Sequence, residues 1–439
     1  MKKIMKVLSL LLVLVMMVSA CSNGGSSDKA TDDSQEVVKD NADDQDAKEN
    51  LEPIKIGVIQ PRSGALAVSG EDSYWGSQIA FDLINERGGI DGRMVEVVSA
   101  DVPDATAAQN EVNRLIQNEG VKVITGIYGS SMAEVAGNIS NRNDVLYWES
   151  ISVTDRLTSK GYEGVFRIHI NGSGFGQQAA EIAAKFSKDI GIAVEDIKVA
   201  IICVNNDFGQ SVATGVEEFA NESGMQIVLN ELYDSKSTDT SPMVLQLKNA
   251  DPDIVIATSY INDGIDLTKQ SRILDFNPKL YIGIGSGYGL PAYAEALGDD
   301  ANGMIDIDAS QKPVYDTLDA DLAEAVKEFE VRFEEERGYQ PPVVGYLTFQ
   351  AAWVLAYEVI AKAGGTEDYQ AMIDAANAID MQLGSLPTGA GVRFDENGQN
   401  ERALLVAMQW QEGALETIYP ESMATSEPIM IPRPNWSER

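Results

Sequence analysis

Short apolar segments alternate with helical patterns along most of this chain, and the alternation occurs in two separate series. The first series predicts strands at residues 54–59, 95–100, 121–127 and 145–148. The second series predicts strands at residues 199–204, 226–232, 254–258 and 280–284. Strands that alternate with helices form parallel sheets through right-handed crossovers. Two series therefore predict an α/β protein with two doubly wound, Rossmann-like lobes.

Helical patterns connect these strands, and some of them lie far along the chain. In residues 73–87 the apolar side chains recur at helical spacing, as at Ile79, Leu83 and Ile84. Two long apolar-striped helices, 321–337 and 344–363, follow the second series, and we expect them to return to the first lobe. Residues 391–410 read as a strand, an Asn-Gly turn and a strand that cover the second lobe.

These patterns predict the domain boundaries. The N-terminal lobe is expected at 53–169 and 306–390, the C-terminal lobe at 170–305 and 391–420, and a tail at 421–439. The folded part is too long for one ordinary domain.

The first 20 residues have the features of a bacterial lipoprotein signal peptide. Three lysines precede an apolar run at 7–17, and small residues lead to Cys21. The run is too short to cross a bilayer as a helix and lacks the polar face of a buried amphipathic helix. The sequence "VSAC" resembles a lipobox, which predicts cleavage before Cys21 and a lipid anchor on its thiol.

Residues 21–52 are predicted to be an acidic, disordered tether. Ten acidic residues face three lysines, and no aromatic residue is present. Such a segment cannot offset its own ordering entropy. As a flexible chain it reaches roughly 30 Å, enough to hold a folded body clear of the lipid headgroups.

Composition excludes several functions. The formal net charge is −35 and the isoelectric point about 4.2, which argues against nucleic-acid partners and against adsorption on anionic lipid.

Cys203 lies in an apolar strand, where we expect a buried, inert thiol, and no disulfide framework is possible. The sole histidine, His169, is expected to be structural, near a lobe crossing. The segment 395–401 superficially resembles a calcium loop, but it lacks the glycine at the sixth position and the closing glutamate expected in such loops. We therefore expect a hairpin turn there and no metal site.

The loops after the strands are the expected ligand site, because ligands of parallel sheets gather at the carboxyl ends of strands. One of these loops is "QPRSGALAVSGEDSYWG", residues 60–76, in which a Ser/Gly loop connects a strand to a helix. This arrangement is typical of phosphate cradles, yet the loop lacks the lysine that phosphate binding usually requires.

Several segments resemble one known family. "IKIGVIQPRSGALAVSGEDSYWGSQIAFDLINERGGIDGR", "VKVITGIYGSSMAEVAGNI", "VAIICVNNDFGQSVATGVEE" and the "FDENGQ" turn resemble the type I solute-binding proteins of ABC importers, in the leucine/isoleucine/valine-binding group. The resemblance covers nearly all of residues 54–410. It implies a monomeric receptor with a hinge and an interlobe cleft that closes on a small-molecule ligand and delivers it to an ABC permease. It implies no cofactor and no metal.

The resemblance also implies which residues face the ligand. Carried over to this sequence, they are Ser69, Tyr128, Ser130, Ser131, Trp148, Ile151, Ser152, Val153, Phe208, Tyr260 and Asp263. In the amino-acid binders of the family, the serine matching Ser130 and backbone N–H groups near Val153 hold the α-carboxylate. Unpaired N–H groups at helix starts suit such an anion.

The positions that would hold an α-ammonium group depart from the family pattern. Amino-acid binders use a threonine hydroxyl and a second-lobe carboxylate, and the matching positions here are Val153 and Gly285. An unpaired buried ammonium group is costly. Either Asp263 or Glu149 takes over this role, or the ligand has no ammonium group. In the second case Trp148, Tyr128, Phe208, Tyr260 and Tyr288 would wall a pocket for an aromatic or aliphatic carboxylate.

The sequence is compatible with two other functions. A ligand sensor for a membrane signalling protein would use the same closure. An extracellular hydrolase would need two acids flanking a cleft, and with one histidine no Ser-His or Cys-His pair is available. We therefore expect no enzyme but an extracytoplasmic, lipid-anchored binding protein.

Overall fold

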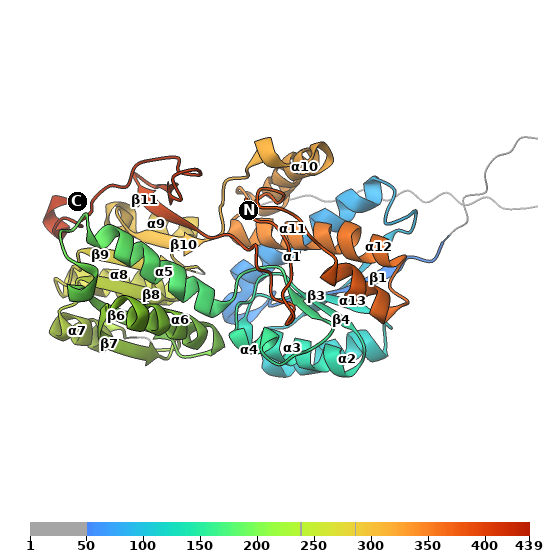
Figure 1. Ribbon diagram of the computed structural model, residues 1–439, viewed down its shortest axis with the longest axis horizontal. Coiled ribbons are helices and arrows are strands. Elements are labelled where there is room, and N and C mark those ends of the chain that lie inside the picture. Colours follow the sequence, from blue (N-terminus) through green and yellow to red (C-terminus); the bar gives the residue numbers. More distant parts are fainter. Residues whose placement is uncertain (1–50, 238, 286) are drawn as a thin grey trace, which may run out of the picture. The chain divides into compact units, whose positions relative to one another are not determined.

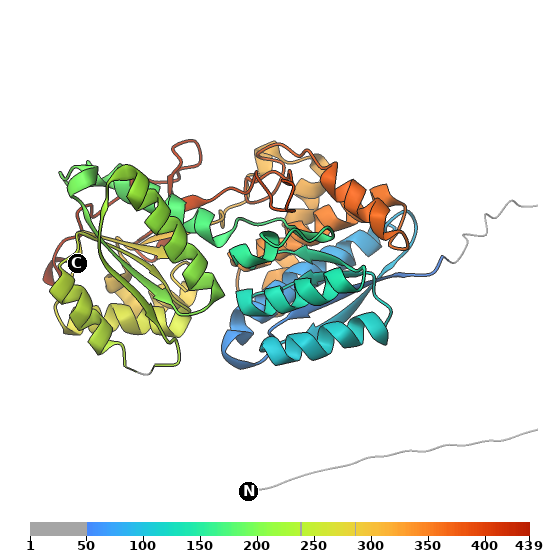
Figure 2. The same ribbon diagram turned by 60° about the horizontal axis from the view of Figure 1, so that its bottom comes forward.

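The computed structural model describes residues 51–237, 239–285 and 287–439 (Figure 1). The predicted signal peptide, Cys21 and the tether up to residue 50 lie outside the described residues. The part of the chain from Leu51 to Arg439 forms one unit with two sheets, each covered by helices (Figures 1 and 2).

The sheet of the first lobe has five parallel strands in the order β2-β1-β3-β4-β5. Their bounds are β1 (Ile54–Gln60), β2 (Val95–Asp101), β3 (Val123–Gly126), β4 (Leu146–Glu149) and β5 (Val165–Arg167). The four strands predicted for this lobe are confirmed. Strand β5 was not predicted, because three residues are too few to show a periodic pattern.

The sheet of the second lobe has seven strands in the order β12-β11-β10-β9-β8-β6-β7. Five of them are parallel: β6 (Lys198–Val204), β7 (Gln226–Tyr233), β8 (Ile254–Thr258), β9 (Leu280–Ile284) and β10 (Ile305–Asp308). The hairpin of β11 (Val406–Gln411) and β12 (Ala414–Tyr419) adds an antiparallel edge. The two doubly wound lobes are thus confirmed.

Helices from distant parts of the chain complete the first lobe. Its helices are α1 (Ala67–Glu86), α2 (Ala105–Gln117), α3 (Ser130–Arg142), α4 (Asp155–Thr158), α10 (Ala320–Arg337), α11 (Val343–Val354), α12 (Ala361–Ala363) and α13 (Tyr369–Asn377). Phe329 and Phe349 from the returning helices share a core with Ile56 and Phe81, as predicted. Helices α1 and α11 approach closely at Gly76. A Cβ atom on this residue would lie only 2.4 Å from the carbonyl oxygen of Gly345, so the contact requires glycine.

The helical run from Val343 to Ala363 contains the π-helical turn Leu355–Ile360 and is long and apolar enough to cross a membrane. However, 89% of its most apolar stretch is buried inside the lobe. It is a core helix.

The second lobe is covered by α5 (Gly172–Ser187), α6 (Asp207–Ser223), α7 (Ser241–Ala250), α8 (Ile261–Ile273) and α9 (Pro291–Leu297). Short 3₁₀ turns occur at Gly64–Leu66, Val194–Asp196, Gly298–Ala301, Tyr315–Thr317 and Trp436–Glu438. Cys203 lies fully buried in β6, and burial raises the pKa of its thiol to about 11, so it is inert at neutral pH.

The lobe crossings differ slightly from the predicted boundaries. Strand β10 belongs to the second sheet, so the chain returns to the first lobe after Asp308 rather than at residue 306. Val392 and Phe394 pack in the core of the first lobe, so only the later part of the predicted strand–turn–strand segment, β11, covers the second lobe.

A buried arginine joins two of the crossings. Arg167, at the end of β5, is fully buried. Its guanidinium donates to Gln399 Oε1 at 2.7 Å, to the Thr154 carbonyl at 2.6 Å and to Thr158 Oγ1 at 2.8 Å. Burial lowers the pKa of Arg167 to about 10, so it stays charged at neutral pH. The "FDENGQ" turn is therefore held against the first crossing.

Candidate functional site

A cavity at the carboxyl ends of strands from both sheets is lined by residues of both lobes. The lining residues are Tyr128, Gly129, Ser130, Ile151, Ser152, Val153, His169, Phe175, Phe208, Tyr260, Gly285, Asp308, Val343, Val344 and Leu347. We call it the interlobe cavity. Its place agrees with the general rule for ligand sites of parallel sheets.

Helix α3 points its N-terminus at this cavity. Gly129 precedes the helix with φ of 133°, a conformation that favours glycine, and Ser130 is the first helical residue. The hydroxyl of Ser130 accepts a hydrogen bond from Val153 N at 3.4 Å. The first N–H groups of a helix lack intrahelical acceptors and carry partial positive charge. This wall of the cavity therefore suits a carboxylate.

Glu149 lies behind the same wall and holds its loops in place. Its carboxylate accepts hydrogen bonds from the backbone N–H groups of Ile127 (3.0 Å), Ile151 (2.8 Å) and Ser152 (2.7 Å), and from the Tyr147 hydroxyl (2.6 Å). Burial raises the pKa of Glu149 to about 7, and these hydrogen bonds act in the opposite direction. Glu149 does not line the cavity, so it is not placed to bind an ammonium group there.

The stretch at residues 60–76 supports the site without lining it. Gln60, at the end of β1, accepts a hydrogen bond from Tyr128 N at 2.9 Å. Ser69 lies inside α1, is 7% exposed and does not contact the cavity. A Cβ on Gly70 would lie 2.0 Å from the Pro61 carbonyl oxygen, so glycine lets the helix pack on the strand end. The loop serves packing rather than phosphate binding.

Two aromatic residues of the second lobe form the opposite wall. Phe208 lies in the first turn of α6, and Tyr260 immediately precedes α8. Their ring centroids are 6.5 Å apart, and Asn206 Nδ2 donates to the Tyr260 hydroxyl at 3.0 Å. This wall suits an apolar group of the ligand.

The other predicted residues of the second lobe lie elsewhere. Asp263 accepts a hydrogen bond from the Tyr233 hydroxyl and does not line the cavity. Tyr288 is fully buried and shares a hydrogen bond with Ser259. Asp263, like Glu149, is therefore not placed to take the ammonium role.

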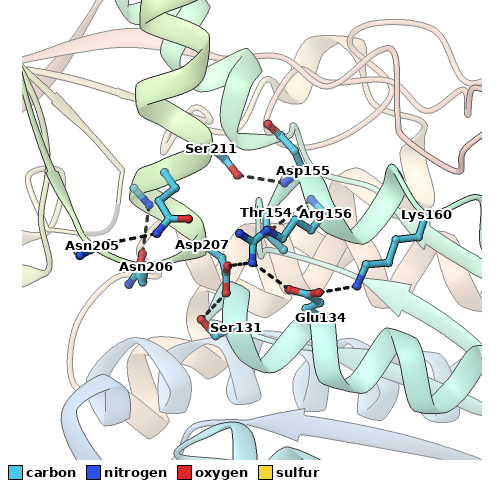
Figure 3. Close-up of polar contacts among 12 residues, drawn as sticks. Ser131, Glu134, Thr154, Asp155, Arg156, Lys160, Asn205, Asn206, Asp207 and Ser211 are labelled. Carbon is cyan, nitrogen blue, oxygen red and sulfur yellow. Dashed lines mark hydrogen bonds and ion pairs between the residues drawn. The ribbon is translucent and has the colours of Figure 1, made fainter. Parts of the chain in front are cut away.

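Ser131 contacts the other lobe instead of the cavity. Its hydroxyl donates to Asp207 Oδ2 at 2.7 Å, and Arg156 donates to Asp207 Oδ1 at 2.8 Å (Figure 3). Nearby, Asp155 N donates to Ser211 Oγ at 3.2 Å. Helices α3 and α4 of the first lobe thus bind the start of α6 in the second. We call this set the rim contact.

Trp148 lies in the core of the first lobe. It is fully buried, and its indole N–H donates to the Ala351 carbonyl at 2.9 Å. Of the predicted ligand-facing residues, the cavity brings together Tyr128, Ser130, Ile151, Ser152, Val153, Phe208 and Tyr260. It does not include Ser69, Ser131, Trp148 or Asp263.

Sequence reasoning did not identify several lining residues. These are Gly129, His169, Phe175, Asp308, Val343, Val344 and Leu347. His169 lies at the crossing, as expected, but it also lines the cavity. Burial and nearby Arg167 lower the pKa of His169 to about 3, so its imidazole is neutral. Asp308 ends a strand that the sequence did not reveal, although "IDID" places two acids in an otherwise apolar segment.

Comparison with known proteins agrees with this architecture. Residues 53–414 match the family described as periplasmic binding protein. The chain is 35% identical to Leu/Ile/Val-binding protein homolog 7 of Brucella abortus over 383 residues, which cover 87% of this chain and 94% of that one.

Two solved structures share the fold. One is the branched-chain amino acid transporter substrate binding protein LivJ of Streptococcus pneumoniae in complex with isoleucine (TM-score 0.70, 21% identity, 84% of this chain and 100% of that one). The other is a solute binding protein from R. palustris in complex with benzoate (TM-score 0.69, 17% identity, 83% and 95% covered). One fold thus holds an amino acid in one case and an aromatic acid in the other.

Proposed function

This chain belongs to the periplasmic binding protein family, and from this premise we propose that it is the substrate-binding protein of an ABC importer. It captures a small carboxylate-bearing molecule, of the branched-chain amino acid type, in the interlobe cavity. The observation that carries the proposal is one cavity with a helix N-terminus in its first-lobe wall and aromatic rings in its second-lobe wall. The family is one of solute-binding proteins, and catalysis forms no part of the proposed function.

The proposed mechanism is hinged closure. A ligand first docks on Ser130 and the start of α3, and then Phe208 and Tyr260 of the second lobe cover it. A ligand shifts this equilibrium only by its differential affinity for the closed form. A micromolar ligand has a standard binding free energy of about 8 kcal/mol, enough to offset a closure cost of a few kcal/mol. The permease would recognise the closed form, with the receptor acting as a monomer.

A ligand screen tests this function directly. We expect leucine, isoleucine, valine or phenylalanine, or an acid such as benzoate, to raise the melting temperature, because a ligand that binds only the folded state stabilises it by mass action. Titration calorimetry then gives the affinity. If no amino acid and no carboxylic acid in the panel binds, the proposed function is wrong.

Truncation of Tyr260 tests the assignment of the cavity. Tyr260→Ala should weaken binding of the best ligand of the screen at least about tenfold, because an aromatic wall is lost. Tyr260→Phe is the matched control, since it keeps the ring and loses only the hydroxyl contact with Asn206. Calorimetry that finds unchanged affinity in a folded Tyr260→Ala protein would contradict the assignment.

We also propose that Cys21 carries the lipid anchor and places the protein on the extracytoplasmic face of the cell membrane. Cys21→Ser should move the protein from the membrane fraction to the soluble fraction, because the thiol that would carry the lipid is absent. Fractionation of cells that express each variant gives the result. A serine variant that stays with the membrane would argue against the anchor.

A further inference from the structure

Asp308 is the one acidic residue among the described residues that line the interlobe cavity. It ends β10 and is 5% exposed. Its Oδ1 accepts a hydrogen bond from Ala309 N at 2.7 Å. In the described part of the chain, no hydrogen bond or ion pair engages Oδ2. Asp308 lines the cavity, so this oxygen can accept a hydrogen bond from a bound ligand.

Asp308 lies beside Gly285, the position at which the family resemblance places a carboxylate. Strands β9 and β10 pair in parallel, with Ile284 opposite Ile307, and Gly285 N donates to the Ile307 carbonyl at 3.0 Å. A Cβ on Gly285 would lie 3.5 Å from Asp308 Oδ2. The Asp308 carboxylate therefore comes from the neighbouring strand to the space that a side chain at 285 would enter.

A second buried acid lies beside Asp308 and adds no negative charge of its own. Asp306 lies two residues earlier on the same face of β10 and is fully buried. Neither of its carboxylate oxygens has a hydrogen-bond partner among the described residues. No ion pair of the described chain involves Asp306 or Asp308, and the neutral imidazole of His169 brings no positive charge. Burial and the neighbouring Asp308 raise the pKa of Asp306 well above its usual range, so Asp306 keeps its proton at neutral pH. Burial raises the pKa of Asp308 to about 7, so at pH 8 Asp308 carries the negative charge at this end of the cavity and suits a positively charged ligand group.

We propose that Asp308 binds the α-ammonium group of an amino-acid ligand, while Ser130 and the first N–H groups of α3 bind its α-carboxylate. This inference rests on the proposed function and narrows its ligand class. The side chain of the ligand would contact Phe208, Tyr260 and Leu347, which are apolar or aromatic. The ligand is then a zwitterionic α-amino acid with an apolar side chain, and a carboxylic acid without an amine is a poor substitute.

A matched pair of ligands tests the assignment. L-Leucine and 4-methylpentanoate differ only by the α-ammonium group, and calorimetry at pH 8 measures both. Wild-type protein should bind leucine at least about tenfold more tightly, because only leucine brings a charged hydrogen-bond donor to Asp308. Asp308→Asn should lose at least about tenfold in leucine affinity and change its 4-methylpentanoate affinity less than about threefold.

Asp306→Asn is the matched control, because it removes a neighbouring acid that does not line the cavity. It should keep the preference for leucine. Equal binding of both ligands to wild-type protein, a preference that persists in Asp308→Asn, or equal losses in both variants would overturn the role of Asp308 while leaving a binding protein. The wild-type comparison decides even if a variant fails to fold. Failure of every amino acid and acid to bind would instead remove the proposed function itself.

Discussion

Replacing Glu149 by alanine is expected to lower the free energy of unfolding by at least about 3 kcal/mol. The backbone N–H groups of Ile127, Ile151 and Ser152 would lose their buried acceptor, and each unsatisfied group costs about 1 to 3 kcal/mol. The same loops form one wall of the cavity, so leucine binding should weaken as well. Urea denaturation followed by circular dichroism measures the first effect, and calorimetry measures the second.

Glu149→Gln removes the negative charge of the side chain but keeps one hydrogen-bond acceptor. The amide keeps one acceptor oxygen for the three N–H groups, so this variant should lose clearly less stability than the alanine variant. If alanine and glutamine variants unfold at the same urea concentration as the wild type, Glu149 does not hold these loops.

Arg167→Ala is expected to lower the free energy of unfolding by about 3 kcal/mol. The change leaves the Thr154 carbonyl, Thr158 Oγ1 and Gln399 Oε1 without their buried donor, and it opens a space in the first crossing. Scanning calorimetry should show a lower melting temperature. Because Arg167 joins two crossings, the scan should also detect whether the two lobes begin to unfold in separate transitions.

Arg167→Lys is the appropriate comparison. Lysine keeps the positive charge, but its single ammonium group cannot reproduce the planar fork that reaches three acceptors. An intermediate loss of stability is therefore expected. A lysine variant as unstable as the alanine variant would mean that the geometry of the fork matters more than the charge, and an alanine variant as stable as the wild type would contradict the role of Arg167.

Much of the fold could be predicted from the sequence because parallel strands buried on both faces are continuous apolar runs. Segments such as β6 and β8 are of this kind, and each is followed by a helical pattern. The return of α10 and α11 to the first lobe followed from the same patterns. The strands β5, β10 and β12 were missed. Of these, β5 and β10 are short, and β10 carries two acids that break its apolar run.

The site could be predicted only in part, because sequence position places a residue at a strand end but does not say where its side chain points. Ser130 and Ser131 are neighbours, yet one hydroxyl lies at the cavity and the other contacts Asp207. The position of Asp308 beside Gly285 could not be predicted from the sequence, because it depends on the pairing of β10 with β9. Lateral neighbours in a sheet carry no local sequence signal.

Because of the rim contact, ligand binding should depend on the salt concentration. Arg156 is 58% exposed in its side chain, so its pairing with Asp207 is open to dissolved ions. Screening by salt weakens such exposed pairs. The affinity for a ligand with zero net charge should therefore fall as the salt concentration rises, because the salt weakens the rim contact between the two lobes rather than the contacts of the ligand itself.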